Sequence, residues 1–244
     1  MKSSMKSSMK SSMKPLKIYV KESIFDDVED IANNDTILIE QFLKDNYKIT
    51  GSYIIKDGVV DVKGDVHVKN ANIESLTNGL FRFGNVTRGF YCSACKNITS
   101  LKGAPKEVGG NFFCTNCDNL ISLEGAPRKV GRSFWCNNCP NLASLEGAPK
   151  EVGGGFDCDD CDKLTSLEGA PRKVGMGFYC IQCKNLKTLK GAPREVGKSF
   201  WCDNCPKLTS LEGAPDKVGA GIYCRECDSI KITDRDRKKY NINP

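Results

Sequence analysis

The sequence predicts a repeat solenoid, mainly β, built as a single parallel sheet of stacked 22-residue coils with a small α/β N-terminal cap. Three observations lead to this fold class. The unit G-x-x-F-x-C-x-x-C-x-x-L-x-x-L-x-G-A-P-x-x-V recurs with a constant period and no insertion. Each unit has about six apolar positions, too few for a core unless neighbouring units stack on it. The first cysteine of the unit marks the period, at Cys92, Cys114, Cys136, Cys158, Cys180, Cys202 and Cys224.

Residues 1–14 read MKSSMKSSMKSSMK, a four-residue repeat rich in serine and lysine. Such a composition lacks the apolar bulk that a folded segment buries, which predicts a disordered Met/Lys/Ser tail. The period would also place the methionines on one face of a helix. A helix lying on a membrane surface is therefore the alternative interpretation.

Residues 15–58 are expected to form the small α/β cap, which covers the open end of the first coil. Residues 16–20 (LKIYV) alternate like a short strand, and residues 24–49 follow with helical spacing of apolar side chains. The run NNDT at 33–36 predicts a break into two helices, with Asn, Asp or Thr capping the second. The apolar positions are Ile24, Val28 and Ile31 in the first helix, and Ile37, Ile39, Phe42 and Leu43 in the second.

The solenoid is predicted over residues 59–233, with one degenerate coil followed by seven regular coils. Within one regular coil, Phe112 and Cys114 share the inward face of a short strand, and Phe113 points outward. Gly125 and Pro127 then turn the chain and prevent further strand or helix. Residues 234–244 are predicted to form a basic C-terminal tail.

The run F-x-C-x-x-C-x-x-L-x-x-L resembles the L-x-L-x-x-N/C-x-x-L core of leucine-rich repeats, with Phe and the first cysteine in the two leucine positions. The LxSLEGAP ending is similar to the short repeats of bacterial and bacteriophage-encoded members of that family. The resemblance covers roughly residues 60–233. It implies that the second cysteine of each coil turns inward as a structural ladder and hydrogen-bonds the backbone of adjacent coils. Gly-Ala-Pro stands where the family has a helical return, so the convex side and the curvature stay open. The second cysteines are Cys95, Cys117, Cys139, Cys161, Cys183, Cys205 and Cys227.

The cysteine pairs allow three interpretations. The spacing C-x2-C-x18-C-x2-C fits a four-cysteine zinc site, for example one formed by Cys114, Cys117, Cys136 and Cys139. The repeat generates that spacing automatically, however, and seven pairs do not divide into four-cysteine sites. Disulfides within each pair would require an oxidising compartment. We favour structural free thiols and no cofactor, because free cysteine behaves as a small buried hydrophobe.

The residue between Phe and the first cysteine faces outward, and six of the seven regular coils place an aromatic side chain there. A contiguous exposed aromatic stripe usually marks a binding site, and Trp and Tyr are favoured in such sites. We therefore expect a protein partner to bind it, with a glycan as the alternative and mutual stacking of the rings as a compatible structural role. The proposed binding residues are Tyr91, Phe113, Trp135, Tyr179, Trp201 and Tyr223.

Asp157 interrupts this stripe within the acidic run DCDDCD. Four acids in one turn could hold a cation, although solvated loop charge is the commoner explanation for such a run. His67 occupies the equivalent position in the degenerate coil.

Composition narrows the function classes further. The total charge is +6, but the four lysines of residues 1–14 carry +4 and residues 231–240 carry a net +3, which leaves about −1 for the rest. The repeat body thus has no basic stripe of the kind that nucleic acid selects, and no run of about 20 apolar residues could cross a membrane. No secretory signal is visible, which favours the cytoplasm. One histidine cannot serve seven cysteine pairs, and no phosphate loop or paired-carboxylate cleft stands out, so we expect a protein that is not an enzyme.

Overall fold

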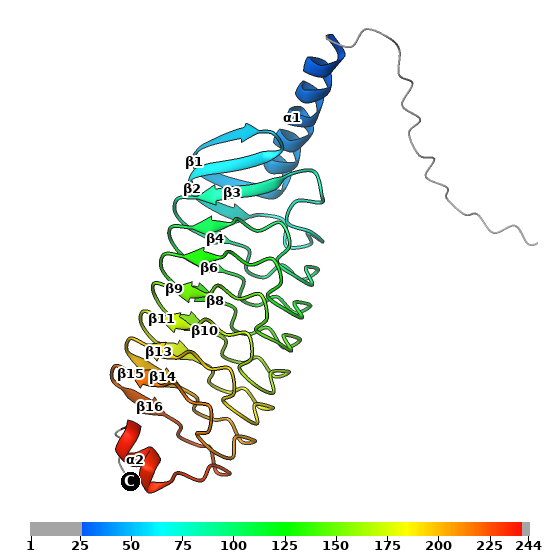
Figure 1. Cartoon of the computed structure of the whole chain (residues 1–244). Helices are drawn as coiled ribbons and strands as arrows, with labels where there is room; N and C mark the ends of the chain where they lie inside the picture. Colours follow the sequence, from blue (N-terminus) through cyan, green and yellow to red (C-terminus); the bar gives the residue numbers. More distant parts are fainter. Residues whose placement is uncertain (1–25, 241–244) are drawn as a thin grey trace, which may run out of the picture.

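The computed structural model describes residues 26–240, with side chains from residue 34 onward, and shows a solenoid of stacked coils (Figure 1). The predicted fold class, a parallel sheet of 22-residue coils, is confirmed. The sheet has 16 strands, and two rows of short parallel strands run down the column and meet at one long strand, β2 (Val59–Val68). The tail at 1–14 and the strand expected at 16–20 lie outside the described residues.

The N-terminal end consists of helix α1 (Asp26–Asn46) and strand β1 (Tyr47–Lys56), which pairs antiparallel with β2. The predicted break of this helix at 33–36 is wrong, because α1 runs without interruption. Asn, Asp and Thr disfavour helix by only tenths of a kcal/mol each, and the run contains no Gly or Pro. Ile39 and Leu43, each 2% exposed, anchor the helix on the solenoid. Tyr47 then closes the first coil, since its hydroxyl donates to the Leu76 carbonyl and its ring lies edge-on to Phe83.

The first row of strands carries the Phe-x-Cys motif. Its members are in register, so that Phe112 lies opposite Phe134 and Phe113 opposite Trp135. Backbone hydrogen bonds join each coil to the next, for example from Phe112 N to Ser133 O at 2.9 Å. The strands are β4 (Phe90–Tyr91), β6 (Phe112–Phe113), β8 (Phe134–Trp135), β10 (Phe156–Asp157), β12 (Phe178–Tyr179), β14 (Ser199–Trp201) and β16 (Gly221–Tyr223).

A second row of strands follows the Gly-Ala-Pro turns, and the sequence did not reveal it. Each member is only two residues long after the first, and its valine faces inward. Arg128 N donates to Lys106 O at 2.8 Å and continues the ladder between coils. The strands are β3 (Arg82–Val86), β5 (Glu107–Val108), β7 (Lys129–Val130), β9 (Glu151–Val152), β11 (Lys173–Val174), β13 (Glu195–Val196) and β15 (Lys217–Val218).

The core of the column is built from the apolar positions expected of each coil. In the coil that begins at Gly109, the six predicted inward side chains are 0–1% exposed: Phe112, Cys114, Cys117, Leu120, Leu123 and Val130. The same positions are buried in the neighbouring coils, so equivalent side chains form continuous columns. Each coil therefore depends on its neighbours for its core, as expected of a solenoid.

Two glycine positions of the repeat lie where a side chain would meet the backbone of the preceding coil. Gly125 has φ of +89°, and a Cβ at this position would lie 2.6 Å from Lys102 Cα of the preceding coil. Gly175 has an ordinary φ, but its Cβ would overlap the Gly153 carbonyl oxygen. Both positions let adjacent coils approach at the spacing of paired strands.

The C-terminal end is covered by helix α2 (Asp234–Tyr240), within the segment that was expected to be a basic tail. Thr233 begins the helix with a reciprocal cap. Its hydroxyl and backbone N–H both donate to Asp236 Oδ2, and Asp236 N donates to Thr233 Oγ1 at 3.2 Å. Tyr240 is 8% exposed and packs on the last coil. The helix thus closes the solenoid at the end opposite α1 (Figure 1).

Candidate functional site

The first row of strands carries phenylalanine on its inner side and a second set of rings on its outer side. The inner phenylalanines are buried and stack in parallel, with centroids 5.1–5.5 Å apart and planes within 9° from Phe90 to Phe200. We call the outer side chains the outer aromatic row, which comprises His67, Tyr91, Phe113, Trp135, Tyr179, Trp201 and Tyr223.

The outer aromatic row lies at the surface. Trp135 is 40% exposed and Tyr223 36%, and the other members are half-buried. Neighbouring rings stack: Phe113 and Trp135 are 4.2 Å apart with planes 6° apart, and Trp201 and Tyr223 are 3.9 Å and 12° apart. In these two pairs the rings turn their faces toward one another and present their edges to solvent, whereas Tyr91 and Phe113 meet edge-on, 5.3 Å apart with planes at 78°.

The row is broken at Asp157, which lies in register between Trp135 and Tyr179. Among the described side chains, no ring stacks on the face of Trp135 that points toward this coil. Tyr179 does not fill the gap, because its ring lies back over Gly177, where a Cβ would overlap the tyrosine hydroxyl. The outer aromatic row is therefore interrupted by one coil that carries an acid and no ring, with the stacked pair Phe113 and Trp135 before it and the stacked pair Trp201 and Tyr223 after it.

The gap carries two carboxylates that accept hydrogen bonds from backbone N–H groups, as Asp159 Oδ1 does from Ile181 N at 2.6 Å, but that pair with no cation among the described side chains. Burial raises the pKa of Asp159 to about 7, and the nearby Asp157 carboxylate adds to the shift. Burial also raises the pKa of Asp157, which accepts a hydrogen bond from Asp159 N at 2.9 Å. That bond uses the Asp159 N–H, which would otherwise donate to the side chain of Asn137 in the preceding coil. Asn137 Oδ1 is therefore buried without a hydrogen-bond partner among the described residues.

A different arrangement occurs at the C-terminal end of the row. The Arg225 guanidinium lies over the Trp201 ring, 5.5 Å from its centroid, and pairs with Asp203 Oδ2 at 3.2 Å. Asp203 is held in place because its Oδ1 accepts from Arg225 N at 2.7 Å. The sequence analysis missed these two residues. They follow Trp201 and Tyr223 by two positions and so share the outward face of the chain, which was the available signal.

The thiols lie inside the column in two rows. The first cysteine of a coil donates to a carbonyl of the next coil, as Cys114 Sγ does to Trp135 O at 3.5 Å. The second cysteine donates to the preceding coil, as Cys139 Sγ does to Cys114 O at 3.3 Å, and the same bond recurs from Cys117 to Cys227. All fourteen cysteines are free, and all except Cys224 are buried. The two rows of thiols thus link consecutive coils through their backbone carbonyls.

Burial raises the pKa of the first thiol in each coil from Cys92 to Cys202 well above its usual range, because a thiolate would be desolvated there. Thiols held neutral in this way are poor nucleophiles. The zinc alternative placed Cys114, Cys117, Cys136 and Cys139 around one ion. Within residues 34–240 the structure has no group of three or more His, Cys, Asp or Glu side chains arranged to hold a metal ion. His67, the only histidine, stacks on Tyr91 at 4.5 Å.

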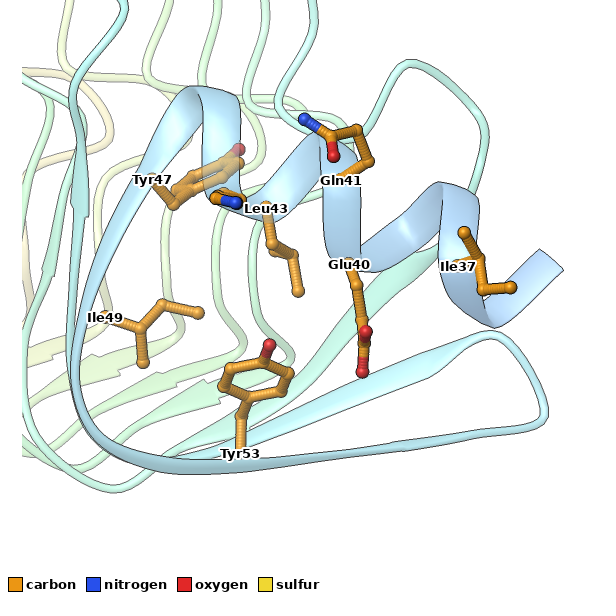
Figure 2. Close-up of a pocket in the computed structure, with 8 residues that line it drawn as sticks. Ile37, Glu40, Gln41, Leu43, Tyr47, Ile49 and Tyr53 are labelled. Atoms are coloured by element: carbon orange, nitrogen blue, oxygen red, sulfur yellow. The ribbon is translucent and has the colours of Figure 1, made fainter. Parts of the chain in front are cut away.

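Figure 2 shows a groove at the N-terminal end, between α1 and one face of β1. Its volume is about 430 Å³, and Ile37 and Tyr53, 61% and 39% exposed, lie at its open side. Glu40 and Leu43 point into it from the helix, toward Ile49 and Tyr53 on the strand (Figure 2). The groove lies at the helix–hairpin end of the molecule, away from most of the outer aromatic row (Figure 1).

Comparisons with family models, curated proteins and solved structures found no match to this chain. A search of the described residues found no helix with the length and apolarity that a membrane span requires.

Proposed function

We propose that the protein is a non-enzymatic recognition scaffold that binds a protein partner across the outer aromatic row. The observation that carries the proposal is the surplus of rings. The inner phenylalanine row and the columns of Leu, Val and Cys already supply a complete core, yet Trp135 and Tyr223 remain 40% and 36% exposed on the opposite side of the same strands. An exposed, aligned set of Trp, Tyr and Phe is the composition of interface hot spots.

The geometry supports a protein partner over a glycan. Sugar rings stack on broad open aromatic faces, whereas Phe113 covers one face of Trp135 and Tyr223 covers one face of Trp201, which leaves single faces and edges. Edges and side-chain gaps along a rigid surface suit interdigitating side chains. The coils are held by backbone ladders on two sides, so little conformational entropy is lost when a partner binds.

The proposal also includes the class of repeat protein and the cellular compartment. The inward Phe-x-Cys positions and the second-cysteine bonds to adjacent coils support a scaffold like the leucine-rich repeats, with two-residue strands in place of a helical return. Fourteen free thiols suit a reducing compartment such as the cytoplasm.

The test is partner capture by the double variant Trp135→Ala/Trp201→Ala. The purified protein is cross-linked in an extract of its source cells, and the captured proteins are compared with those of the native protein. We expect the double variant to lose capture while its thermal unfolding stays cooperative. Ile121→Ala is the matched control, because Ile121 is an exposed apolar side chain (55%) outside the row. Retention of the same captured partner by the double variant would refute the proposal.

A further inference from the structure

The gap in the outer aromatic row has the parts of a binding site for a basic side chain, and the molecule itself shows how such a site is filled. At the C-terminal end, Trp201, Asp203 and Arg225 form a unit in which a guanidinium lies over an indole ring and pairs with a carboxylate. The acid comes two residues after the tryptophan, and the arginine comes from the following coil. A cation over a tryptophan face and beside a carboxylate gains from both interactions.

The gap offers the same kinds of group in a different arrangement, since Asn137 follows Trp135 by two positions and the acids Asp157 and Asp159 come from the following coil, where Arg225 lies relative to Trp201. Trp135 has one face stacked on Phe113 and the other directed toward the coil of Asp157 and Asp159. In that coil Gly155 and Asp157 carry no bulky group on the outer face, and the Tyr179 ring lies back over Gly177, with its edge 3.6 Å from where a Cβ on Gly155 would lie. Strands two positions apart are separated by about 9.6 Å, which leaves room for one planar group about 3.4 Å thick beside the indole. No Lys or Arg among the described side chains forms an ion pair or a ring contact with Trp135, Asp157 or Asp159.

We propose that the gap binds an arginine side chain of the protein partner, with the guanidinium on the open face of Trp135 and its N–H groups donating to Asp157 and Asp159. This inference rests on the proposed function and names the chemistry that the partner presents at the centre of the row. Arginine suits the site better than lysine, because a planar guanidinium stacks on an indole and reaches two carboxylates at once.

Two further features of the gap fit a cationic ligand. Asn137 Oδ1 is buried without a hydrogen-bond partner among the described residues, in the same column as Asp159 and one coil away, so the coil beside the gap has an unpaired acceptor. The two aspartates have raised pKa values because their charge is partly desolvated and repelled by neighbouring acids, among them Asp160 and Asp203. A bound cation relieves that repulsion, so the site is more favourable occupied than empty at pH 8.

Asp157 also departs from the repeat pattern, which places an aromatic side chain at this position, and this departure indicates a function. Six of seven regular coils carry a ring at its position, and an aromatic side chain there would continue the stack from Trp135. The aspartate instead leaves an orphaned amide oxygen and a partly desolvated charge. A residue that stabilises the fold less than the usual residue of the repeat is expected where the position has a binding role.

The experiment is a titration of the 15N-labelled full-length protein with N-acetyl-argininamide at pH 8, followed by the two tryptophan indole N–H signals. We expect a saturable shift of the Trp135 signal only, because Tyr223 and Arg225 cover one face of Trp201 and the coil toward its other face carries Tyr179 and Ile181 in place of the two aspartates. The neutral isostere N-acetyl-citrullinamide should give no saturable shift. Asp157→Asn and Asp159→Asn should each weaken binding about five- to tenfold, the range expected from losing one charge-assisted hydrogen bond at a partly exposed site.

Asp118→Asn is the matched control, since Asp118 is an exposed acid outside the gap, and it should leave the affinity within about twofold. Three results would each overturn the inference. The first is no shift of the Trp135 signal at N-acetyl-argininamide concentrations up to about 50 mM, which is on the order of weak single-residue binding. The others are equal shifts of both indole signals and an equal response to N-acetyl-citrullinamide. These outcomes do not depend on partner capture. If capture needs the two tryptophans but tolerates Asp157→Asn, the proposed function stands and the arginine site fails.

Discussion

Replacing Asp157 by phenylalanine should stabilise the protein, because the change repairs the break in the outer aromatic row. Asp157 lies in register with Trp135 on one side and Tyr179 on the other, and the face of Trp135 toward it carries no ring. A phenylalanine there continues the stack from Phe113 and Trp135. It also removes a carboxylate whose pKa is raised by burial.

The magnitude follows from three contributions. A new ring pair with Trp135 contributes about 0.5–1.5 kcal/mol. Removal of the partly buried carboxylate contributes about 1 kcal/mol after allowance for solvent screening, and it also relieves repulsion on Asp159. The lost hydrogen bond from Asp159 N, 2.9 Å long, costs about 1 kcal/mol, but Asn137 Oδ1 is free to accept the same N–H. The net stabilisation is about 1–2 kcal/mol, or about 2–8 °C in Tm for a chain of this size.

Thermal and urea unfolding of the native protein and the variant at pH 8 measure this change, with Asp118→Phe as a control outside the row. A stabilisation confined to Asp157→Phe agrees with the reasoning. A lower Tm for Asp157→Phe, or an equal gain for Asp118→Phe, would mean that the outer rings do not form one stack and that position 157 is not a gap in it. The stabilised variant should also lose the response to N-acetyl-argininamide, because the added ring fills the site.

Other parts of the structure give three more predictions. Cys139→Ala should destabilise the protein by about 2 kcal/mol, since it empties a buried position and removes a bond to the preceding coil, and urea unfolding against an Ile121→Ala control checks this. Stability should fall as pH rises from about 4 to about 7, because the Asp159 carboxyl holds its proton more tightly in the folded than in the unfolded chain; Asp159→Asn should flatten that part of the profile, and an unchanged profile would contradict the assignment. Gly175→Ala should lower the free energy of unfolding by more than about 2 kcal/mol, because the new Cβ overlaps backbone atoms of the preceding coil. Gly58→Ala should lower it by only about 1 kcal/mol, because Gly58 has φ of +66° but open space around it. Similar losses of stability at both sites would show that the spacing of the coils is not limiting.

The repeat made most of the column predictable. A fixed period places equivalent residues in columns, and alternation along a strand then separates Phe112 and Cys114, which are inside, from Phe113, which is outside. The second row of strands was not predictable in the same way. Its members are two residues long, as in Glu107–Val108, and so short a segment shows no alternation.

The ends of the chain follow local rules that compete with tertiary contacts. The run at 33–36 contains residues that favour helix caps, yet Ile39 and Leu43 pack on the first coil and the helix continues through it. At the other end, Thr233 and Asp236 have the spacing of a capping box, which was a readable signal for α2.

The gap itself could be seen in the sequence only in part. Asp157 was visible as an interruption, but its meaning depends on ring orientations that no pattern encodes. Tyr179 leans back because Gly177 has no side chain, and Trp135 is open because Phe113 covers only one of its faces. The comparison with Arg225 over Trp201 required coordinates as well, because it joins residues 24 positions apart in neighbouring coils.

A thiol titration with and without denaturant tests the stacking of the coils most directly. With thiols buried in two internal rows and rings outside, the native protein should react only in its last coil, at the half-buried Cys224 and at Cys227, whose pKa a hydrogen bond with Cys205 lowers to about 7, whereas all fourteen thiols should react once the chain is unfolded. Rapid reaction of most thiols in the native protein would place them at the surface and reverse the inner and outer sides. Fewer than fourteen in denaturant without reductant would show disulfides instead of free thiols.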